Sequence, residues 1–303
     1  MHPSALRYFL EVARIGSLNA AAERLRVSAS AVSRQIAKLE EEVASPLFER
    51  RSRGMALTHA GRLLSSYAQR AALESEQIVS EIRQLKGASR GMVRIAATEG
   101  MAHSLLPEVI HAFRAERPNV VFDLHVMAPA HVIPAVQEGA VDIGVSFSLS
   151  PEGGVQIQWQ GAKASFAFAS PDHPLIGRGV VSIAEIFAHP IAILDDAATI
   201  RRVLDIYCAT KGLSLEPALT STNVASLLHF CRFGGAVTFA TYLSARAAVR
   251  DGRLALVPFE EANFLERKLQ IHTMLGRKLP QTVQDFLAAL IAELEDPGPL
   301  EPR

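Results

Sequence analysis

A stretch from Thr58 to about Lys86 repeats small or apolar side chains every three or four residues. A helix with one apolar seam shows this heptad spacing. At 1.5 Å per residue, about 29 residues form a rod of roughly 43 Å, too long for a local core to cover. We expect the rod to pair with a partner helix, most simply from a second copy of the chain. The seam consists of Leu64, Ala68, Ala71, Ser75, Ile78, Ile82 and Leu85.

The residues before this rod predict a small helical head. A first helix carries one apolar face and ends at Gly16, the usual place for a C-terminal glycine. Ser17 can cap a short alanine-rich helix over 19–25, and Ser28 can cap a third helix over 29–40. The predicted inward residues are Leu6, Phe9, Leu10 and Ala13 of the first helix and Val32, Ile36 and Leu39 of the third.

The outer face of the third helix begins with short side chains and carries longer donors one turn later. A helix that enters the major groove of DNA needs this order, because close approach excludes bulk at its start. Its unpaired first amides also favour a phosphate. An ordinary helical hairpin with a solvated face fits the pattern equally well. The outer residues are Ala29, Ser30, Ser33, Arg34 and Lys38.

Two short predicted strands between 47 and 58 surround the sequence Arg51-Ser52-Arg53-Gly54. With Arg50, this hairpin carries arginines near its tip, where they suit contacts with a DNA backbone or minor groove. A merely soluble turn is the alternative.

The formal charge of the chain is zero, with 31 Lys+Arg and 31 Asp+Glu. However, residues 1–90 carry 14 basic and 9 acidic side chains, so a basic head precedes an acidic body.

Residues 5–62 resemble the winged helix-turn-helix of the LysR-type transcriptional regulators. The matching positions are Leu6, Phe9, Ala13, Gly16, Ser17, Ala20, Ala21, Ala22, Leu25, Ser28, Ser33, Arg34, Gln35, Ile36, Leu39, Glu40, Leu47, Phe48, Arg50, Leu57, Thr58 and Gly61. The resemblance implies an α+β chain: an N-terminal winged helix-turn-helix, a long linker helix and a C-terminal two-lobed α/β effector domain like the periplasmic binding proteins. The expected partners are double-stranded promoter DNA, a small-molecule effector and further copies of the chain, as a dimer or tetramer.

The implied boundaries are a DNA-binding domain at 1–58, a dimerisation helix at 59–87, a hinge at 88–91 and an effector domain at 92–303. Lobe I is expected at 92–163 and 267–295, and lobe II at 164–266. The DNA-binding residues are expected to be Ser17, Ser28, Ala29, Ser30, Ser33, Arg34, Lys38, Arg50, Arg51 and Arg53. The dimerisation residues are expected to be Leu64, Ala68, Ala71, Ile78, Ile82 and Leu85.

Three segments of the sequence depart from the family pattern. The reading helix usually begins Ser-Gln-Pro, and here the sequence is Ser28-Ala29-Ser30, so sequence preference is expected to shift. Ala44 replaces the usual glycine after this helix, which predicts a different C-cap. Phe233 displaces a glycine before a later strand, where it either narrows the cleft or repacks the helix end.

The body of the chain alternates strands and helices, which predicts two α/β lobes that the chain joins near 162–166 and 264–268. Small ligands bind in clefts between such lobes. Loops at the ends of the predicted strands supply candidate effector contacts, each of which can equally be a cap, core residue or solvated residue. They are Thr98, Glu99, Gly100, Ala128, His131, Ser146, Phe147, Thr199, Ile200 and Arg201.

The charge of the effector stays open. A helix N-terminus at 99–103 favours an anion, with Arg201 as its counter-charge. Glu99 argues against a carboxylate at that point and favours a cationic or hydroxylated ligand.

Enzymatic motifs are absent: the sequence has no G-x-S-x-G, H-E-x-x-H, Walker or dinucleotide-binding pattern. We therefore expect no enzyme activity, no metal and no cofactor. We expect the protein to be a cytoplasmic regulator. One alternative is a redox sensor that uses Cys208 and Cys231, although no basic cluster adjoins either thiol. Another is a small-molecule binding protein whose head serves oligomerisation.

Overall fold

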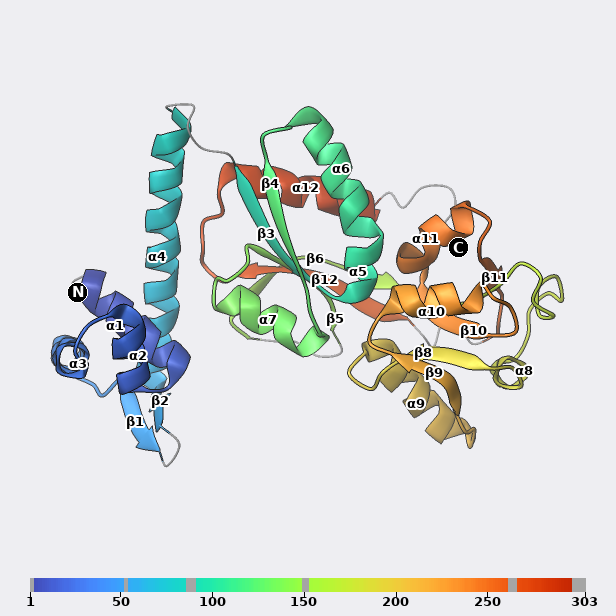
Figure 1. Ribbon diagram of the computed structural model, residues 1–303, viewed down its shortest axis with the longest axis horizontal. Coiled ribbons are helices and arrows are strands. Elements are labelled where there is room, and N and C mark those ends of the chain that lie inside the picture. Colours follow the sequence, from blue (N-terminus) through green and yellow to red (C-terminus); the bar gives the residue numbers. More distant parts are fainter. Residues whose placement is uncertain (1–2, 52–53, 86–90, 149–152, 261–265, 296–303) are drawn as a thin grey trace. The chain divides into compact units, whose positions relative to one another are not determined.

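The computed structural model describes residues 3–51, 54–85, 91–148, 153–260 and 266–295 (Figure 1). The chain divides into a smaller N-terminal unit and a larger unit that begins at residue 90. The predicted hinge at 88–91 lies, apart from Gly91, outside the described residues.

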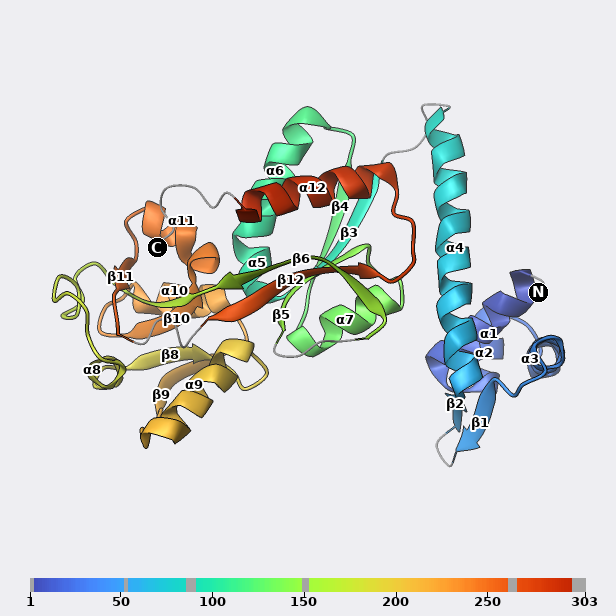
Figure 2. The same cartoon turned by 180° about the vertical axis from the view of Figure 1, so that it is seen from behind.

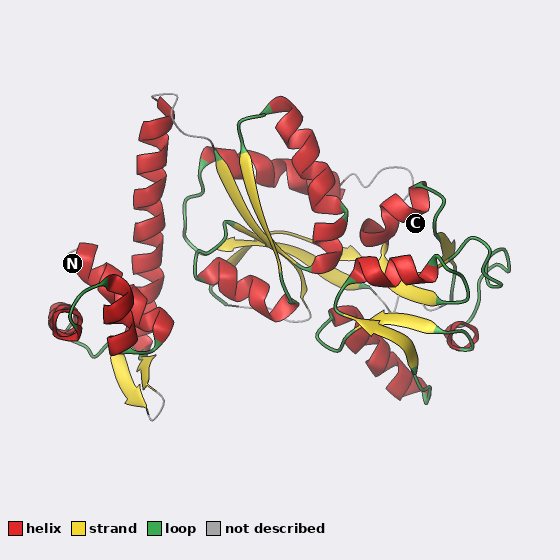
Figure 3. Cartoon of the chain, in the orientation of Figure 1, coloured by secondary structure: helices red, strands yellow, loops and turns green. Residues whose placement is uncertain are grey.

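The N-terminal unit is a helical head with a hairpin, followed by a long helix (Figure 3). The expected helices and both hairpin strands are present. Phe48 pairs with Leu57 and Arg51 with Gly54 in the antiparallel hairpin. The elements are α1 (Pro3–Ile15), α2 (Leu18–Leu25), α3 (Ala29–Val43), β1 (Phe48–Arg51), β2 (Gly54–Leu57) and α4 (His59–Leu85).

Serine caps start two of these helices as predicted. The Ser17 side chain accepts a hydrogen bond from the Ala20 amide, and that of Ser28 accepts one from the Ala31 amide at 3.2 Å. The prediction of a different C-cap at Ala44 is wrong. Ala44 adopts the left-handed conformation at φ 49° that a glycine would take there, and its amide bonds to the carbonyls of Glu40 and Glu41. The helix therefore keeps the left-handed cap, although the Cβ of alanine makes this backbone conformation less favourable than it is for glycine.

The core of the head buries the predicted inner stripe of α3. Val32, Ile36 and Leu39 pack with Phe9 of α1 and with Leu47. The start of α4 belongs to the same core. Leu64 is 8% exposed and Ala68 is 1% exposed, so neither offers much surface to a partner helix. This corrects the expectation that the seam begins at Leu64. Among the α4 side chains that the structure describes, the exposed large apolar ones are Leu63, Tyr67, Ile78, Val79 and Ile82, and the side chain of the predicted seam residue Leu85 lies outside the described ones.

The hairpin is fixed to the turn between α1 and α2. The Met55 amide donates to the Gly16 carbonyl at 2.8 Å. Gly54 has φ 125°, and a Cβ there would lie 2.4 Å from the same carbonyl oxygen. Only glycine allows this contact, so the hairpin takes a defined position beside the start of α2.

The larger unit contains two mixed sheets. The sheet of lobe I has the strand order β4-β3-β5-β12-β6, with β3, β4 and β5 parallel and β12 antiparallel to β5 and β6. Helices α6 and α12 lie on one side and α7 on the other (Figures 1 and 2). The elements are β3 (Met92–Ala97), α5 (Glu99–His103), α6 (Leu105–Glu116), β4 (Val121–Val126), α7 (Pro129–Gln137), β5 (Ile143–Ser148), β6 (Val155–Lys163), β12 (Arg267–Met274) and α12 (Gln281–Glu295).

The sheet of lobe II has the order β11-β7-β10-β8-β9. Helices α8 and α9 contribute to the core on one face, and α10 and α11 to the core on the other. The elements are β7 (Ser165–Ala169), α8 (Ile183–Phe187), β8 (Ile191–Leu194), α9 (Thr199–Lys211), β9 (Pro217–Ser221), α10 (Val224–Cys231), β10 (Val237–Thr241), α11 (Tyr242–Arg250) and β11 (Ala255–Val257).

The chain passes between the two sheets at the positions expected for crossovers. Ala164 alone separates β6 from β7, and the return to lobe I brings the chain to Arg267, the first residue of β12. The sequence interpretation did not include β6, α8, β9 or α11. The domain boundaries as a whole remain predictions.

Candidate functional site

A concave surface on the head joins the starts of α2 and α3 to the hairpin. Ser17, Ala29, Ser30, Ser33, Arg50 and Arg51 line it together, although they come from separate parts of the sequence. Asn19, exposed near the start of α2, lines the same groove and was missing from the predicted set. The groove therefore combines hydroxyl groups, an amide and guanidinium groups on one face.

Other predicted DNA-binding residues lie outside this groove lining. Arg34 and Lys38 are exposed on α3, one turn or more beyond Ser30. Ser28 has a structural role, since its hydroxyl caps α3 and lies 3.1 Å from that of Ser30. Ala29, which does line the groove, also packs partly against the head core. Arg53 lies outside the described residues.

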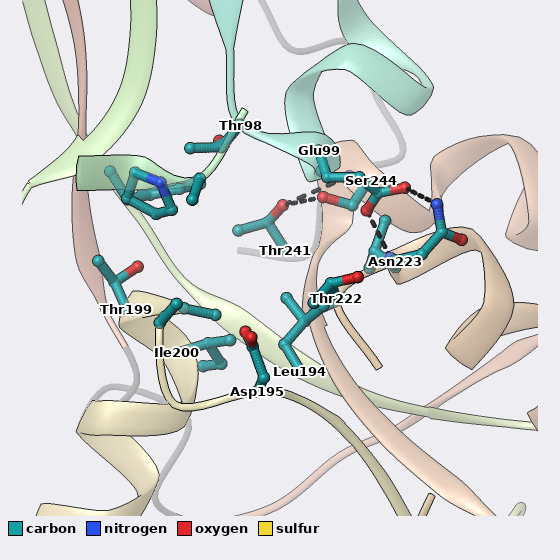
Figure 4. A pocket seen from close by; sticks show the side chains of 18 of the residues that line it. Thr98, Glu99, Leu194, Asp195, Thr199, Ile200, Thr222, Asn223, Thr241 and Ser244 are labelled. Carbon is teal, nitrogen blue, oxygen red and sulfur yellow. Dashed lines mark hydrogen bonds between the residues drawn. The ribbon is translucent and has the colours of Figure 1, made fainter. Parts of the chain in front are cut away.

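A cavity of about 380 Å³ lies between lobe I and lobe II (Figure 4). The carboxyl ends of β3 and β4 reach it from lobe I, and those of β8, β9 and β10 reach it from lobe II. Open α/β sheets bind ligands at this edge because the loops there converge. The volume falls in the range of small-molecule sites.

The structure brings most of the predicted effector residues to this cavity: Thr98, Glu99, Gly100, Ala128, Phe147, Thr199 and Ile200 line it. Ser146, His131 and Arg201 do not. Ser146 alternates with Phe147 along β5 and is buried on the other face of the sheet. His131 is exposed on α7. Arg201 turns to Asp205, one helical turn away, with Nε 2.8 Å from Oδ1.

The positive charge at the cavity comes instead from Arg267, which the sequence interpretation missed. Its Nη1 donates to Thr199 Oγ1 at 2.7 Å, and its Nη2 donates to Ser165 Oγ at 3.0 Å. The guanidinium carbon lies 4.1 Å from the ring centroid of Phe147. Arg267 is 7% exposed, and burial lowers its pKa to about 9. The sequence signal that could have identified Arg267 was its position directly after the predicted second crossover between the lobes.

Glu99 connects the lobes at the opposite end of the cavity. Its carboxylate accepts hydrogen bonds from the Asn223 side chain at 2.9 Å and from the Val224 amide at the start of α10 (Figure 4). Burial raises the pKa of Glu99, and the bonds from the backbone amides of Val224 and Ala225 oppose this shift. Asn223 also accepts from the Ser226 amide, so two side chains cap α10.

Gly100 allows α11 to approach α5 closely. A Cβ at Gly100 would lie 2.6 Å from the Ser244 hydroxyl oxygen. Farther along this contact, Arg246 of α11 pairs with Glu108 and Glu293 of lobe I, each at 2.8 Å. The face formed by α5, α6 and α12 is thus joined to lobe II by hydrogen bonds and ion pairs.

Further polar residues line the cavity that sequence reasoning did not select. They include Asp195, Thr222, Asn223, Thr241 and Ser244. Asp195 directly follows β8, and its side chain is drawn among the cavity-lining sticks in Figure 4. Apolar lining comes from Leu194 and Phe239 among others. Such a mixture of a few polar groups on an apolar wall suits a small organic ligand.

Phe233 does not narrow the cavity. Its side chain is 79% exposed and its ring contacts His229 at a centroid distance of 5.1 Å.

Cys208 and Cys231 are both free and buried. Burial raises the pKa of both thiols, that of Cys231 to about 12, which disfavours the reactive thiolate.

Within the described part of the chain, no three His, Cys, Asp or Glu side chains are grouped as metal ligands. Among the helices described, none is long and apolar enough to cross a membrane.

Two family models match the sequence. The model of the bacterial regulatory helix-turn-helix protein, lysR family, matches residues 3–62, and that of the LysR substrate binding domain matches residues 86–295. A RuBisCO operon transcriptional regulator from Allochromatium vinosum is 25% identical over 264 residues, which cover 86% of each chain.

Solved structures share the fold. A full-length OxyR variant from Pseudomonas aeruginosa has a TM-score of 0.67 at 18% identity, covering 96% of this chain and 94% of that one. Full-length CbnR in complex with its target DNA has a TM-score of 0.53 at 20% identity, covering 96% of this chain and 99% of that one.

Proposed function

The chain belongs to the LysR family of bacterial transcriptional regulators, and on this premise we propose how its own residues bind DNA and effector. The observation that carries the proposal is the groove on the head, which unites the start of α3 with the hairpin arginines. Membership of this family of regulators argues against the alternative in which the head serves only for oligomerisation.

The start of α3 reads bases in the major groove. Ser30 and Ser33 are short enough for close approach, and Arg34 carries the donors that suit a guanine edge. Arg50 and Arg51 of the hairpin contact phosphates, as do Lys38 and the first amides of α3. Ser17 and Asn19 contact the backbone from the start of α2, because both border the same groove.

Helix α4 forms a dimer through its exposed apolar side chains. Ile78 and Ile82 are each more than half exposed in the single chain. Burying them against a second copy removes apolar surface from water. Two such dimers form the tetramer that we propose as the active assembly, in the cytoplasm.

The cavity between lobes I and II holds a small-molecule effector. Its lining combines residues of both lobes, so a ligand contacts both and favours one arrangement of the lobes over another. The resulting population shift changes the angle between dimers, and with it the spacing of the reading heads and the bend of promoter DNA.

Titration of the full-length chain with duplex DNA from its own upstream region tests this proposal, with fluorescence anisotropy at several salt concentrations. We expect binding that weakens steeply with salt, and its loss in Ser33→Asp, which places a carboxylate in the groove. Ser214→Asp, exposed in a lobe II loop, is the matched control. Lack of binding in dilute buffer by a folded chain would overturn the proposal.

A further inference from the structure

A buried cation without a charged partner lines the effector cavity. Arg267 donates to the hydroxyls of Thr199 and Ser165 and lies over the ring of Phe147, all of them neutral groups. Among the described residues, no carboxylate lies within ion-pair distance of it and its Nε lacks a hydrogen-bond partner. A buried charge is normally paired, because removal from water is otherwise costly.

The first turn of α9 adds positive potential at the same corner. Ala198 precedes this 13-residue helix and has no side chain that can cap it. Ala198, Thr199 and Ile200 all line the cavity together with Arg267. An anionic group here would meet helix amides and a guanidinium group.

The α10 end of the cavity is closed to an anion. Glu99 already takes the Val224 amide and the Asn223 side-chain amide. The carboxylate of Asp195 lines the same cavity from the loop between β8 and α9, beside Ile200 in Figure 4, so the like charge at the α10 end comes from Glu99. A second anionic group would therefore meet like charge, whereas a hydroxyl or ammonium group would find acceptors.

We infer that the effector is a small organic acid with a single anionic group, which pairs with Arg267 and the first turn of α9, and that Glu99 excludes a second anionic group from the α10 end. The inference rests on the proposed effector role of this cavity. Arg267 and Glu99 thus determine specificity from opposite ends: one attracts the acid group, and the other sets what the far end of the ligand can carry. A neutral or hydrogen-bond-donating far end fits, and a dicarboxylate does not.

Matched four-carbon acids test this inference without knowledge of the natural ligand. Butyrate, 4-hydroxybutyrate and succinate have the same chain length and differ at the far end. Calorimetric and thermal-shift titrations of the full-length wild-type chain should show saturable binding of butyrate and 4-hydroxybutyrate, about tenfold or more tighter than that of succinate. Absence of saturable binding by all three, or equal or tighter binding of succinate, would overturn the inference.

Substitutions of Arg267 and Glu99 test the role of each end of the cavity. Arg267→Gln should weaken butyrate about 10- to 100-fold, the value of a hydrogen bond to a charged group. Arg201→Gln is the control, because it removes the same charge from α9 at a side chain outside the cavity. The role of Arg267 is contradicted if both variants lose butyrate affinity equally, or if neither variant loses it.

Glu99→Gln should raise the affinity for succinate relative to butyrate about tenfold, since it removes the like charge. An unchanged ratio contradicts the role of Glu99, and this readout is independent of whether Arg267 variants fold. A chain that binds DNA but prefers succinate refutes only this inference. Acid binding that leaves DNA affinity unchanged refutes the effector role instead.

Discussion

The carboxylate of Glu99, in lobe I, accepts a hydrogen bond from the backbone amide of Val224, the first residue of helix α10 in lobe II. Side-chain caps are usually local, from the residue just before a helix. Here a residue more than 120 positions away supplies one, so the alignment of α5 with α10 contributes to the stability of both. The neighbouring Gly100 leaves room for Ser244 of α11 next to this contact.

Gly100→Ala should destabilise the chain by about 1–3 kcal/mol, because its Cβ would overlap the Ser244 hydroxyl. The double variant Gly100→Ala, Ser244→Ala should recover most of the loss, which a double-mutant cycle in urea denaturation measures. Gly153→Ala, where a Cβ meets no atom within 4 Å, is the control. Additive losses in the double variant would contradict the overlap.

Arg34→Ala should weaken binding to upstream DNA by about 1–3 kcal/mol and relax the preference at one base position, as expected for a side chain that reads a guanine. Competition gel shifts with single-base variants of the duplex measure both effects. The control Arg178→Ala removes an exposed arginine beside Glu185 in lobe II. Unchanged affinity and preference would remove Arg34 from the reading face.

Ile78→Glu combined with Ile82→Glu should raise the dissociation constant of the dimer about 100-fold or more, because two exposed isoleucines per chain lose their burial. Light scattering over a dilution series measures it. Val180→Glu, at an equally exposed apolar residue outside α4, should leave the assembly intact. A dimer that survives the double substitution would place the interface elsewhere.

The stability of the chain should fall by about 2 kcal/mol between about pH 7 and about pH 5 through His272 alone. This side chain is 2% exposed, and burial lowers its pKa from 6.5 to about 4. In that window the unfolded chain binds the proton and the folded chain does not, so acid favours unfolding. Urea denaturation of His272→Leu should lack this component, and an identical pH slope in both proteins would contradict it.

Peroxide should leave the DNA affinity unchanged, because a thiol with a pKa of about 12 at Cys231 holds almost no thiolate at neutral pH. Thiol reagents should label Cys208 and Cys231 rapidly only after denaturation. Rapid labelling of the native chain, with a change in DNA affinity, would restore the redox alternative.

The local parts of the molecule followed from the sequence. The Ser28 cap and the buried stripe of Val32, Ile36 and Leu39 depend on residues within two turns of one another, and the structure confirms them. The strand β6 was missed although Val155, Ile157 and Trp159 alternate with glutamines, the pattern of a half-exposed edge strand. Helix α11 was missed because it follows β10 without an intervening loop.

The effector cavity was only partly predictable. Residues at strand ends, such as Thr98 and Thr199, could be selected from the strand pattern alone. The hydrogen-bond partner of each polar side chain could not be predicted in this way, because it depends on contacts between distant segments. Arg201 was selected because it stands at a helix start, but a carboxylate on its own helix satisfies it. Arg267 was missed because it reaches the cavity only through the second crossover.

The single residue between β6 and β7 has a mechanical consequence. With Ala164 as the whole of the first crossover, and with Arg267 bonded to Ser165 beside it, this crossover has no slack chain to absorb a relative displacement of the sheets. A rotation of one lobe about this short connection would therefore displace the far ends of α8 and β11 much more than the residues near Arg267.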